Sequence, residues 1–277
     1  MIPITGDTID GAWMAALDSL LDDELAPGGK AAHLAVAFPA DATNEGVRSA
    51  VDRFLGEAAR QKPSAGLTLI DTVANTLFPS AFYLPDHAEA PRQHLYDMHE
   101  AKMKFHRRRR GPEKETYFSR MTGTDGTGEQ RQNQLEALVT RMRHELTLKG
   151  PKSSAYEVGL SEVVGHLRVQ SPERDRSVMG FPCLSHVSVT LVRRVVHLTA
   201  QYRNQHFIRK ALGNYVGLAR LCEFIAIEVD AAPGQVLCVA AHADAELGLG
   251  IGGRRGYRQL LEDCAAAAAS GIRLDVA

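Results

Sequence analysis

The sequence has few cysteines, no long apolar run and no excess of charge of one sign. Its 277 residues include four cysteines, and 32 Lys and Arg residues nearly balance 33 Asp and Glu residues. This balance argues against a dedicated nucleic-acid-binding protein, which is usually basic. The apolar runs are far shorter than the roughly 20 residues that a membrane-spanning helix needs. We therefore expect no contact with a membrane.

The cysteines (Cys183, Cys222, Cys238 and Cys264) form no Cys-x-x-Cys pair and show no zinc-binding spacing. So few cysteines in a chain of this length do not make a disulfide framework, and reduced thiols are typical of the cytosol. The N-terminal stretch MIPITGDTIDGAW lacks the basic segment and apolar core of a signal peptide. The sequence therefore predicts a cytoplasmic protein without a bound metal.

The N-terminal half of the chain shows mainly helical spacing of apolar residues. A first helix follows a cap at Asp7 or Thr8, and a short strand covers 33–38. Further helices are predicted over 44–60, 67–78 and 134–148. The segment 85–132 is basic and rich in glycine near its end, so we expect it to be irregular.

In the C-terminal half, strands and helices are mixed. Alternating residues predict strands over 187–191 and 196–202, joined by a tight turn at Arg193 and Arg194. A helix over 218–229, a turn at Gly234, a strand over 235–241 and a helix over 256–269 follow. Because no regular βαβ alternation occurs, the pattern favours an α+β fold, with a mixed β-sheet packed against helices in a single domain over 1–277.

Two further motifs have an ordinary structural interpretation as well as a functional one. The run GLGIGG (248–253) lies too near the C-terminus for a dinucleotide-binding fingerprint, so we interpret it as a loop. The run Arg107–Arg110 has the charge to bind a phosphate-rich partner. A short basic run is more often the solvated end of a helix, and we favour that interpretation.

The segment 180–229 contains the residues with chemical potential. Cys183 follows Pro182 directly before the predicted hairpin, Arg203 follows its second strand, and Asn214 opens a helix eleven residues later. A thiol is a nucleophile once a nearby guanidinium favours the thiolate. Arginine also binds phosphate, and an amide matches the N3–H and O4 edge of uracil. Taken singly, these residues are more typical of a buried thiol, a surface ion pair and a helix cap than of a functional site, and only their joint order and spacing favours function.

In this order and spacing, Pro182-Cys183, Arg203-Asn204-Gln205-His206 and Asn214 resemble the folate-dependent thymidylate synthase family, including its pyrimidine nucleotide hydroxymethylases. Weaker matches are ITGDTIDGAWMAAL (4–17) and Asn133-Gln134-Leu135. The resemblance implies that Cys183 is the nucleophile and that Arg203 binds phosphate and supports the thiolate. It also implies that Asn214 recognises the pyrimidine.

The resemblance implies a reaction at C5 of a pyrimidine nucleotide. In the family, the thiolate adds to C6, and C5 then attacks the one-carbon unit of methylenetetrahydrofolate, giving a methyl or hydroxymethyl group. The family also forms homodimers through its sheet. By position, the expected substrate-binding residues besides Arg203 are Tyr202, Asn204, His206, His242 and Asp244.

The chain departs from the family at several positions. The stretch Pro151–Ala155 lacks the family's arginine pair, and 242–246 (HADAE) replaces its Asp-x-His-x-Tyr. The helix expected to carry the acid–base glutamate has Asp71 and Asn75 as its polar candidates. These departures leave a second interpretation open, in which the protein binds a nucleotide or related ligand without turnover.

Overall fold

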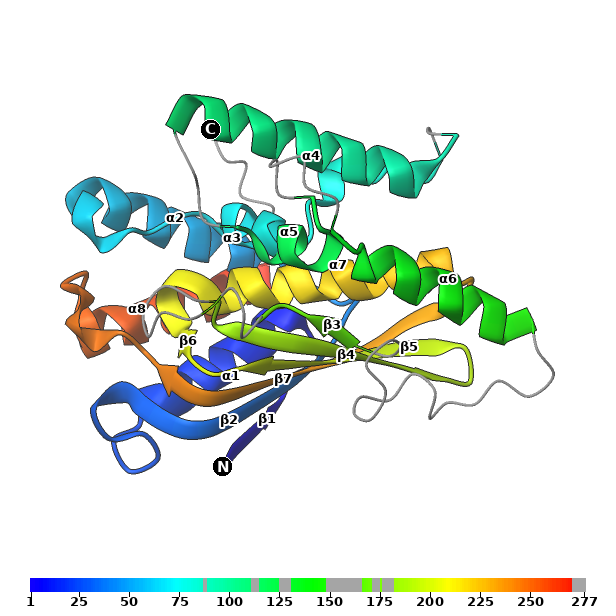
Figure 1. The fold of residues 1–277 in the computed structure, drawn as a ribbon. Helices are drawn as coiled ribbons and strands as arrows, with labels where there is room; N and C mark the ends of the chain where they lie inside the picture. The colour runs from blue at the N-terminus through cyan, green and yellow to red at the C-terminus, as the bar shows by residue number, and fades with distance from the viewer. Residues whose placement is uncertain are drawn as a thin grey trace.

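A computed structural model describes residues 1–86, 89–110, 115–124, 131–147, 166–170, 175 and 182–270. The described chain has an α+β fold in which an open, mixed sheet packs against helices (Figure 1). The predicted fold class is therefore confirmed. Within the described ranges, no helix has both the length and the hydropathy needed to cross a bilayer.

The sheet has seven strands in the order β1-β2-β7-β5-β4-β3, and the short β6 pairs with β7 outside this path. The pairs β1/β2, β5/β7 and β6/β7 are parallel, and the others are antiparallel. The strands are β1 (Ile2–Thr5), β2 (Lys30–Pro39), β3 (His166–Arg168), β4 (Leu184–Val192), β5 (Val195–Tyr202), β6 (Gln205–His206) and β7 (Ala232–Asp244).

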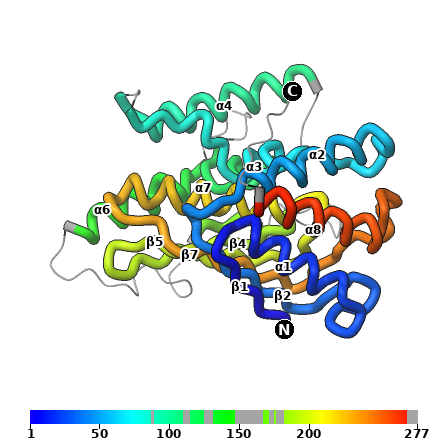
Figure 2. Tube along the Cα trace, turned by 180° about the vertical axis from the view of Figure 1, so that it is seen from behind, coloured from blue at the N-terminus to red at the C-terminus, as the bar shows by residue number. Residues whose placement is uncertain are grey.

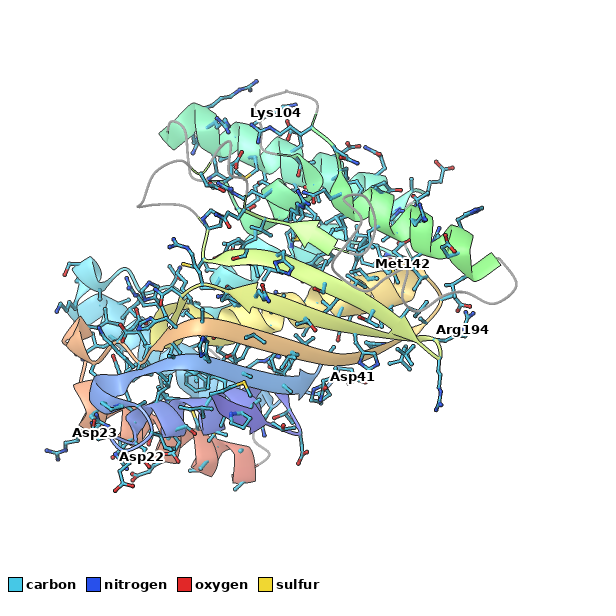
Figure 3. All side chains as sticks on the ribbon, turned by 60° about the horizontal axis from the view of Figure 1, so that its bottom comes forward. Asp22, Asp23, Asp41, Lys104, Met142 and Arg194 are labelled. Atoms are coloured by element: carbon cyan, nitrogen blue, oxygen red, sulfur yellow. The ribbon has the colours of Figure 1, made fainter. Side chains whose placement is uncertain are left out.

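The described helices lie on one side of this sheet. They are α1 (Ile9–Leu21), α2 (Glu45–Gln61), α3 (Ile70–Leu77), α4 (Pro91–Arg110), α5 (Tyr117–Thr122), α6 (Gln134–Thr147), α7 (Leu212–Glu228) and α8 (Gly253–Ser270). Helix α7 runs along the sheet, and α1 and α8 lie side by side in the view from behind (Figure 2). Figure 3 presents the opposite face, with no described helix in front of it.

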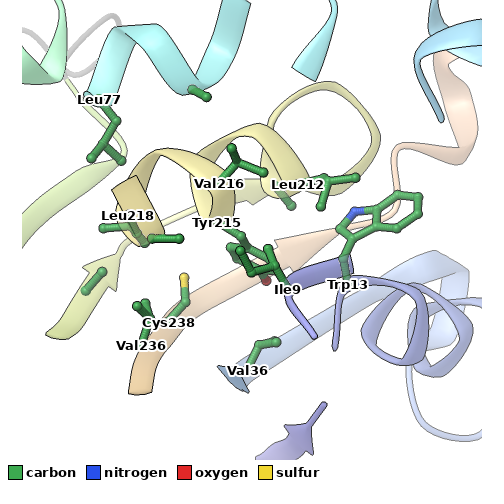
Figure 4. Packing of buried hydrophobic residues seen from close by; sticks show 14 of the residues in the cluster. Ile9, Trp13, Val36, Leu77, Leu212, Tyr215, Val216, Leu218, Val236 and Cys238 are labelled. Carbon is green, nitrogen blue, oxygen red and sulfur yellow. The ribbon is translucent and has the colours of Figure 1, made fainter. Parts of the chain in front are cut away.

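Most of helix α7 is buried because it lies between the sheet and α3. Two glycines allow the close approach to α3, since an added Cβ at Gly213 would lie 2.5 Å from Val73 Cβ, and one at Gly217 2.8 Å from Leu77 Cβ. This contact brings α3 over the first turns of α7. Figure 4 shows the apolar packing of α7 on the sheet, which includes Leu212, Tyr215, Val216, Leu218, Val36, Val236 and Cys238.

Several local predictions are confirmed. Thr8 caps α1 by accepting a hydrogen bond from the Gly11 amide, and Asn44 caps α2 in the same way. Arg193 and Arg194 form the hairpin turn with φ values of 50° and 62°. Positive φ at both central residues is the geometry that suits a two-residue hairpin.

The prediction that 85–132 is irregular is wrong for its described residues, because most of them form α4 and α5. The high charge of the segment masks a buried stripe of Leu95, Tyr96, His99 and Met103 on α4. These buried side chains pack α4 against the rest of the protein.

Gly234 lies within β7, so the predicted turn there is also wrong. A Cβ at Gly234 would lie 2.6 Å from Val195 Cγ1, so glycine permits close contact with β5.

Candidate functional site

Cys183 lies directly before β4, at the end of the sheet where β5 leads toward α7. The Arg203 amide donates a hydrogen bond to the Cys183 carbonyl at 2.9 Å, which extends the β4/β5 pairing by one residue. Arg203 Nε donates to the Pro182 carbonyl at 3.4 Å. The backbone thus places Arg203 beside Cys183, and the guanidinium is held at the Pro182 carbonyl.

Cys183 and Asn214 line the same pocket, which has a volume of about 470 Å³. This volume is within the usual range for small-molecule sites. We call it the Cys183 pocket; its described lining residues come from α3, from 115–120, from Pro182-Cys183 and from the entry to α7. They are Val73, Thr76, Glu115, Thr116, Tyr117, Arg120, Pro182, Cys183, Lys210 and Asn214.

Cys183 is the most accessible of the four cysteines, all of which are free thiols. Burial raises the pKa of Cys222, Cys238 and Cys264 to about 12. Burial also raises the pKa of Cys183, but the positive charge of Arg203 acts in the opposite direction and favours its thiolate. Among these thiols, Cys183 therefore has the surroundings best suited to nucleophilic chemistry.

Three side chains of the pocket have no hydrogen bond to any described residue: those of Cys183, Asn214 and Lys210. Asn214 is only 4% exposed. Buried amides are nearly always hydrogen-bonded, so this arrangement leaves the donor and acceptor of Asn214 for a ligand. Lys210 was missed by the sequence interpretation; it lies on the π-helical turn Phe207–Ala211 before α7.

The carboxylate in the pocket wall is Glu115, which the sequence interpretation also missed. Arg120 binds Glu115 at 3.2 Å and Asp175 at 2.8 Å. Helix α3 contributes Val73 and Thr76 to the pocket instead of the expected polar residues.

Asp71 and Asn75 are instead directed to Arg220, which lies 2.6 Å from the Asp71 carboxylate and 3.5 Å from the Asn75 amide oxygen. Neither residue lines the Cys183 pocket. The expectation that one of them takes the place of the family's acid–base glutamate is therefore not supported by their positions.

None of the six predicted substrate-binding residues is among the described residues that line the Cys183 pocket. Arg203 reaches only the Pro182 carbonyl at its wall, and the polar side chains that follow it lie elsewhere. His242 Nδ1 lies 2.7 Å from Asn204 Oδ1, and Asn204 Nδ2 lies 3.3 Å from His206 Nε2. His206 Nδ1 lies 3.1 Å from Glu246 Oε1. Asp244 accepts a hydrogen bond from the Glu246 amide and pairs with Lys30 at 3.6 Å.

We call the residues His242, Asn204, His206, Glu246 and Arg209 the polar chain. Glu246 accepts hydrogen bonds from the Arg209 amide at 2.9 Å and from Arg209 Nε at 2.5 Å. Burial raises the pKa of Glu246, but the contacts with His206 and Arg209 outweigh it and lower the pKa overall. His206 Nδ1 approaches Glu246 without hydrogen-bond geometry. Asn204 links the two histidines, its Oδ1 accepting from His242 Nδ1 and its Nδ2 donating to His206 Nε2.

The polar chain borders a second, smaller pocket of about 270 Å³, lined in part by His206, Asp244 and the start of the glycine-rich run. Tyr202 lines neither pocket. It is 2% exposed, and its ring packs edge-on against that of Tyr117, which does line the Cys183 pocket. Its position behind the pocket wall does not support the expected contact between Tyr202 and a ligand.

The arginine run forms the C-terminal end of α4, where Arg108 and Arg109 are exposed. Arg109 lies over the ring of Phe105, with 4.7 Å between the guanidinium carbon and the ring centroid. Figure 3 shows Lys104, on the same helix, at the outer edge of the molecule. The exposure of Arg108 and Arg109 agrees with a solvated helix end, and neither of these two residues lines the Cys183 pocket.

The sequence matches no protein-family model and no curated protein. Within the described ranges, no group of three metal-ligating side chains occurs. The stretch 151–155, which has no counterpart of the family's arginine pair in its sequence, lies outside the described residues.

Proposed function

We propose that the protein is a thymidylate-synthase-like enzyme that adds a methyl or hydroxymethyl group to C5 of a pyrimidine nucleotide. One observation carries the proposal. A nucleophilic thiol and a buried amide, Cys183 and Asn214, line one pocket without hydrogen bonds to described residues. The pocket volume of about 470 Å³ suits a ligand of nucleotide size.

In the proposed reaction, the Cys183 thiolate forms a bond to C6, and the electron pair of the C5–C6 double bond makes C5 nucleophilic. Arg203 favours the thiolate by its charge. Asn214 holds the N3–H and O4 edge through its amide, which orients the ring and stabilises negative charge that develops on O4. When bound, methylenetetrahydrofolate supplies the one-carbon unit that C5 receives.

We assign no side chain to the folate. The polar groups of the pocket that lack described partners are few, and the pyrimidine and its charged substituent account for them. Val73, Pro182 and the ring of Tyr117 provide apolar surface in the same pocket, against which a flat ring can pack.

We also propose that the protein is a cytoplasmic homodimer that pairs through the open face of its sheet. Strand alternation directs Val36 and Cys238 toward α7, so Ala35, Leu237 and Val239 point to the opposite face. No described helix covers that face (Figure 3). The free cysteines support a reducing compartment.

A binding protein without turnover is the second candidate, and specific observations favour it. Burial raises the pKa of the Cys183 thiol, whereas efficient nucleophilic catalysis needs it lowered. In addition, α3 presents Val73 and Thr76 to the pocket and no carboxylate. In this alternative, ligand affinity survives replacement of Cys183.

Mass spectrometry of the intact protein separates the two candidates. The protein is incubated with 5-fluoro derivatives of uridine and cytidine nucleotides, ribo and deoxyribo, together with methylenetetrahydrofolate. Fluorine at C5 does not leave as a proton does, so a competent enzyme accumulates a covalent adduct. An adduct that maps to Cys183 supports the enzyme. Nucleotide binding by equilibrium dialysis without any adduct supports the binding protein.

A further inference from the structure

Lys210 is a cationic side chain of the Cys183 pocket whose charge is not neutralised by contact with a described residue. It lies on the turn that connects the polar chain to α7, one residue after Arg209 and four before Asn214. Its ammonium group makes no hydrogen bond or ion pair within the described ranges. Burial, and then the charge of Arg209, lower its pKa, while the more distant Glu246 acts in the opposite direction.

Nearby cations differ from Lys210 in this respect. Arg120, which also lines the pocket, is held by Glu115 and Asp175 at 3.2 and 2.8 Å. Arg209 is held by Glu246 at 2.5 Å. An unpaired ammonium group that is partly withdrawn from water is costly, and an anion that reaches it recovers that cost. The pocket thus combines a partly accessible thiol with a cation that lacks a described partner.

We propose that Lys210 makes the Cys183 pocket selective for ligands that carry negative charge. The proposal concerns the pocket of the proposed function, but it requires neither a pyrimidine nor turnover. An anionic group of the ligand, a phosphate or a carboxylate, contacts the Lys210 ammonium group while another part of the ligand reaches Cys183. Lys210 is thus a specificity-determining residue.

The test measures how charge affects the reaction of Cys183 with three small reagents. These are an anionic (sulfonatoethyl), a cationic (trimethylammonioethyl) and a neutral (methyl) methanethiosulfonate. In each case the thiolate attacks the sulfenyl sulfur, a mixed disulfide forms and methanesulfinate leaves. Peptide mapping isolates the rate at Cys183 from that of the three buried cysteines. The ratio of the anionic rate to the cationic rate reports the local charge. The neutral rate shows separately whether a variant changes the accessibility or reactivity of the thiol itself.

We expect the wild-type protein to prefer the anionic reagent. Lys210→Met should lower the ratio by about fivefold, the scale of one unpaired charge near the thiol at low salt. Lys210→Arg should retain the preference. Lys104→Met removes a lysine from the exposed face of α4, and should leave the ratio unchanged. Circular dichroism confirms that each variant is folded.

An unchanged ratio in Lys210→Met would overturn the proposal, and so would a Cys183 thiol that reacts with none of the three reagents. Inorganic phosphate and acetate are then added as competitors to distinguish the two kinds of anion. The anion that binds at Lys210 should slow the reaction of Cys183 with the anionic reagent more strongly in wild type than in Lys210→Met. If neither does so, the proposal is overturned. Because no nucleotide or folate is present, failure of nucleotide trapping leaves this result intact.

Discussion

The Cys183 pocket and the polar chain both lie near the junction of the sheet with α7, but they use their polar groups differently. In the polar chain, Asn204 is hydrogen-bonded to His242 and His206, His206 contacts Glu246, and Glu246 binds Arg209. In the pocket, the side chains of Cys183, Asn214 and Lys210 have no hydrogen bond to a described residue.

On the proposed function, this difference separates polar groups that are available to a ligand from polar groups whose contacts are made within the protein. Polar groups that are hydrogen-bonded to one another stabilise the folded protein, and they have few donors or acceptors available for a ligand. Polar groups in a pocket that lack a hydrogen-bond partner form these bonds only when a ligand binds. We therefore expect substitutions in the pocket to change binding and chemistry, and substitutions in the polar chain to change stability.

The largest expected effect is on covalent chemistry. Cys183→Ser should lower the rate of adduct formation with the accepted 5-fluoro nucleotide by about a thousandfold or more, because the nucleophile itself is replaced. Thermal unfolding should be nearly unchanged, since Cys183 is only partly buried. The rate is followed by intact mass. An adduct that forms at the wild-type rate would remove Cys183 from the mechanism.

Glu246→Gln should have the largest effect on stability. It leaves Arg209 without its buried anion, at a cost of about 3 kcal/mol in the free energy of unfolding. Urea denaturation measures the change. Asp244→Asn is the matched control: Asp244 pairs with Lys30 at 3.6 Å, and Lys30 is 59% exposed, so a loss below about 1 kcal/mol is expected. Equal losses in both variants would contradict the role of the polar chain.

Wild type and Glu246→Gln also give a test of how stability depends on pH. The pKa of Glu246 is lower in the folded protein than in the unfolded chain. Its stabilisation is therefore present above the unfolded-state pKa and is lost as the pH falls through the folded-state pKa. Wild-type stability should fall more steeply on acidification below the unfolded-state pKa than that of Glu246→Gln. Parallel curves would show that the carboxylate of Glu246 is not what stabilises the chain.

Two asparagines provide a smaller but more direct comparison. Asn214→Ala should weaken nucleotide binding by about tenfold, since it removes the amide contact to the base. Asn204→Ala should leave binding almost unchanged but lower the free energy of unfolding by about 1–2 kcal/mol, because His242 and His206 each lose a partner. Calorimetry and urea denaturation of both variants measure the two effects. The reverse pattern would mean that the polar chain is the ligand site.

The smallest effect is expected on α4. Arg108 and Arg109 lie at an exposed helix end. Replacing both with Ala should change stability by less than about 0.5 kcal/mol per residue and leave adduct formation unaffected. Intact mass and urea denaturation again serve as measurements. A large loss of adduct would mean that the basic run contributes to the pocket after all.

Periodicity and turn chemistry were sufficient to predict much of the fold. The caps at Thr8 and Asn44 and the hairpin at Arg193-Arg194 depend on local interactions, which short stretches of sequence record. Helix α4 was missed because its buried stripe is embedded in dense charge. The extended Gly234 was missed because its cause is contact with Val195 on another strand, which no local pattern reveals.

The site was predictable where the backbone alone brings residues together. Cys183 and Arg203 are neighbours across the β4/β5 ladder, so their proximity follows from the hairpin. Glu115 and Lys210 enter the pocket only through tertiary packing, of α5 and of the turn before α7. The sequence predicted ligand roles for Tyr202 and Asn204 from their place in a motif. It could not reveal that Tyr202 is buried outside the pocket lining and that Asn204 is hydrogen-bonded to His242.

The central claim is that Cys183 and Asn214 form the ligand site and that the polar chain supports it. Peptide mapping after incubation with 5-fluoro nucleotides and methylenetetrahydrofolate tests this most directly, with wild type, Asn214→Ala and Asn204→Ala compared side by side. We predict one adduct per chain at Cys183, formed much more slowly in Asn214→Ala and at nearly the wild-type rate in folded Asn204→Ala. No adduct with any nucleotide, an adduct at another residue, or equal rates in all three proteins would contradict the claim.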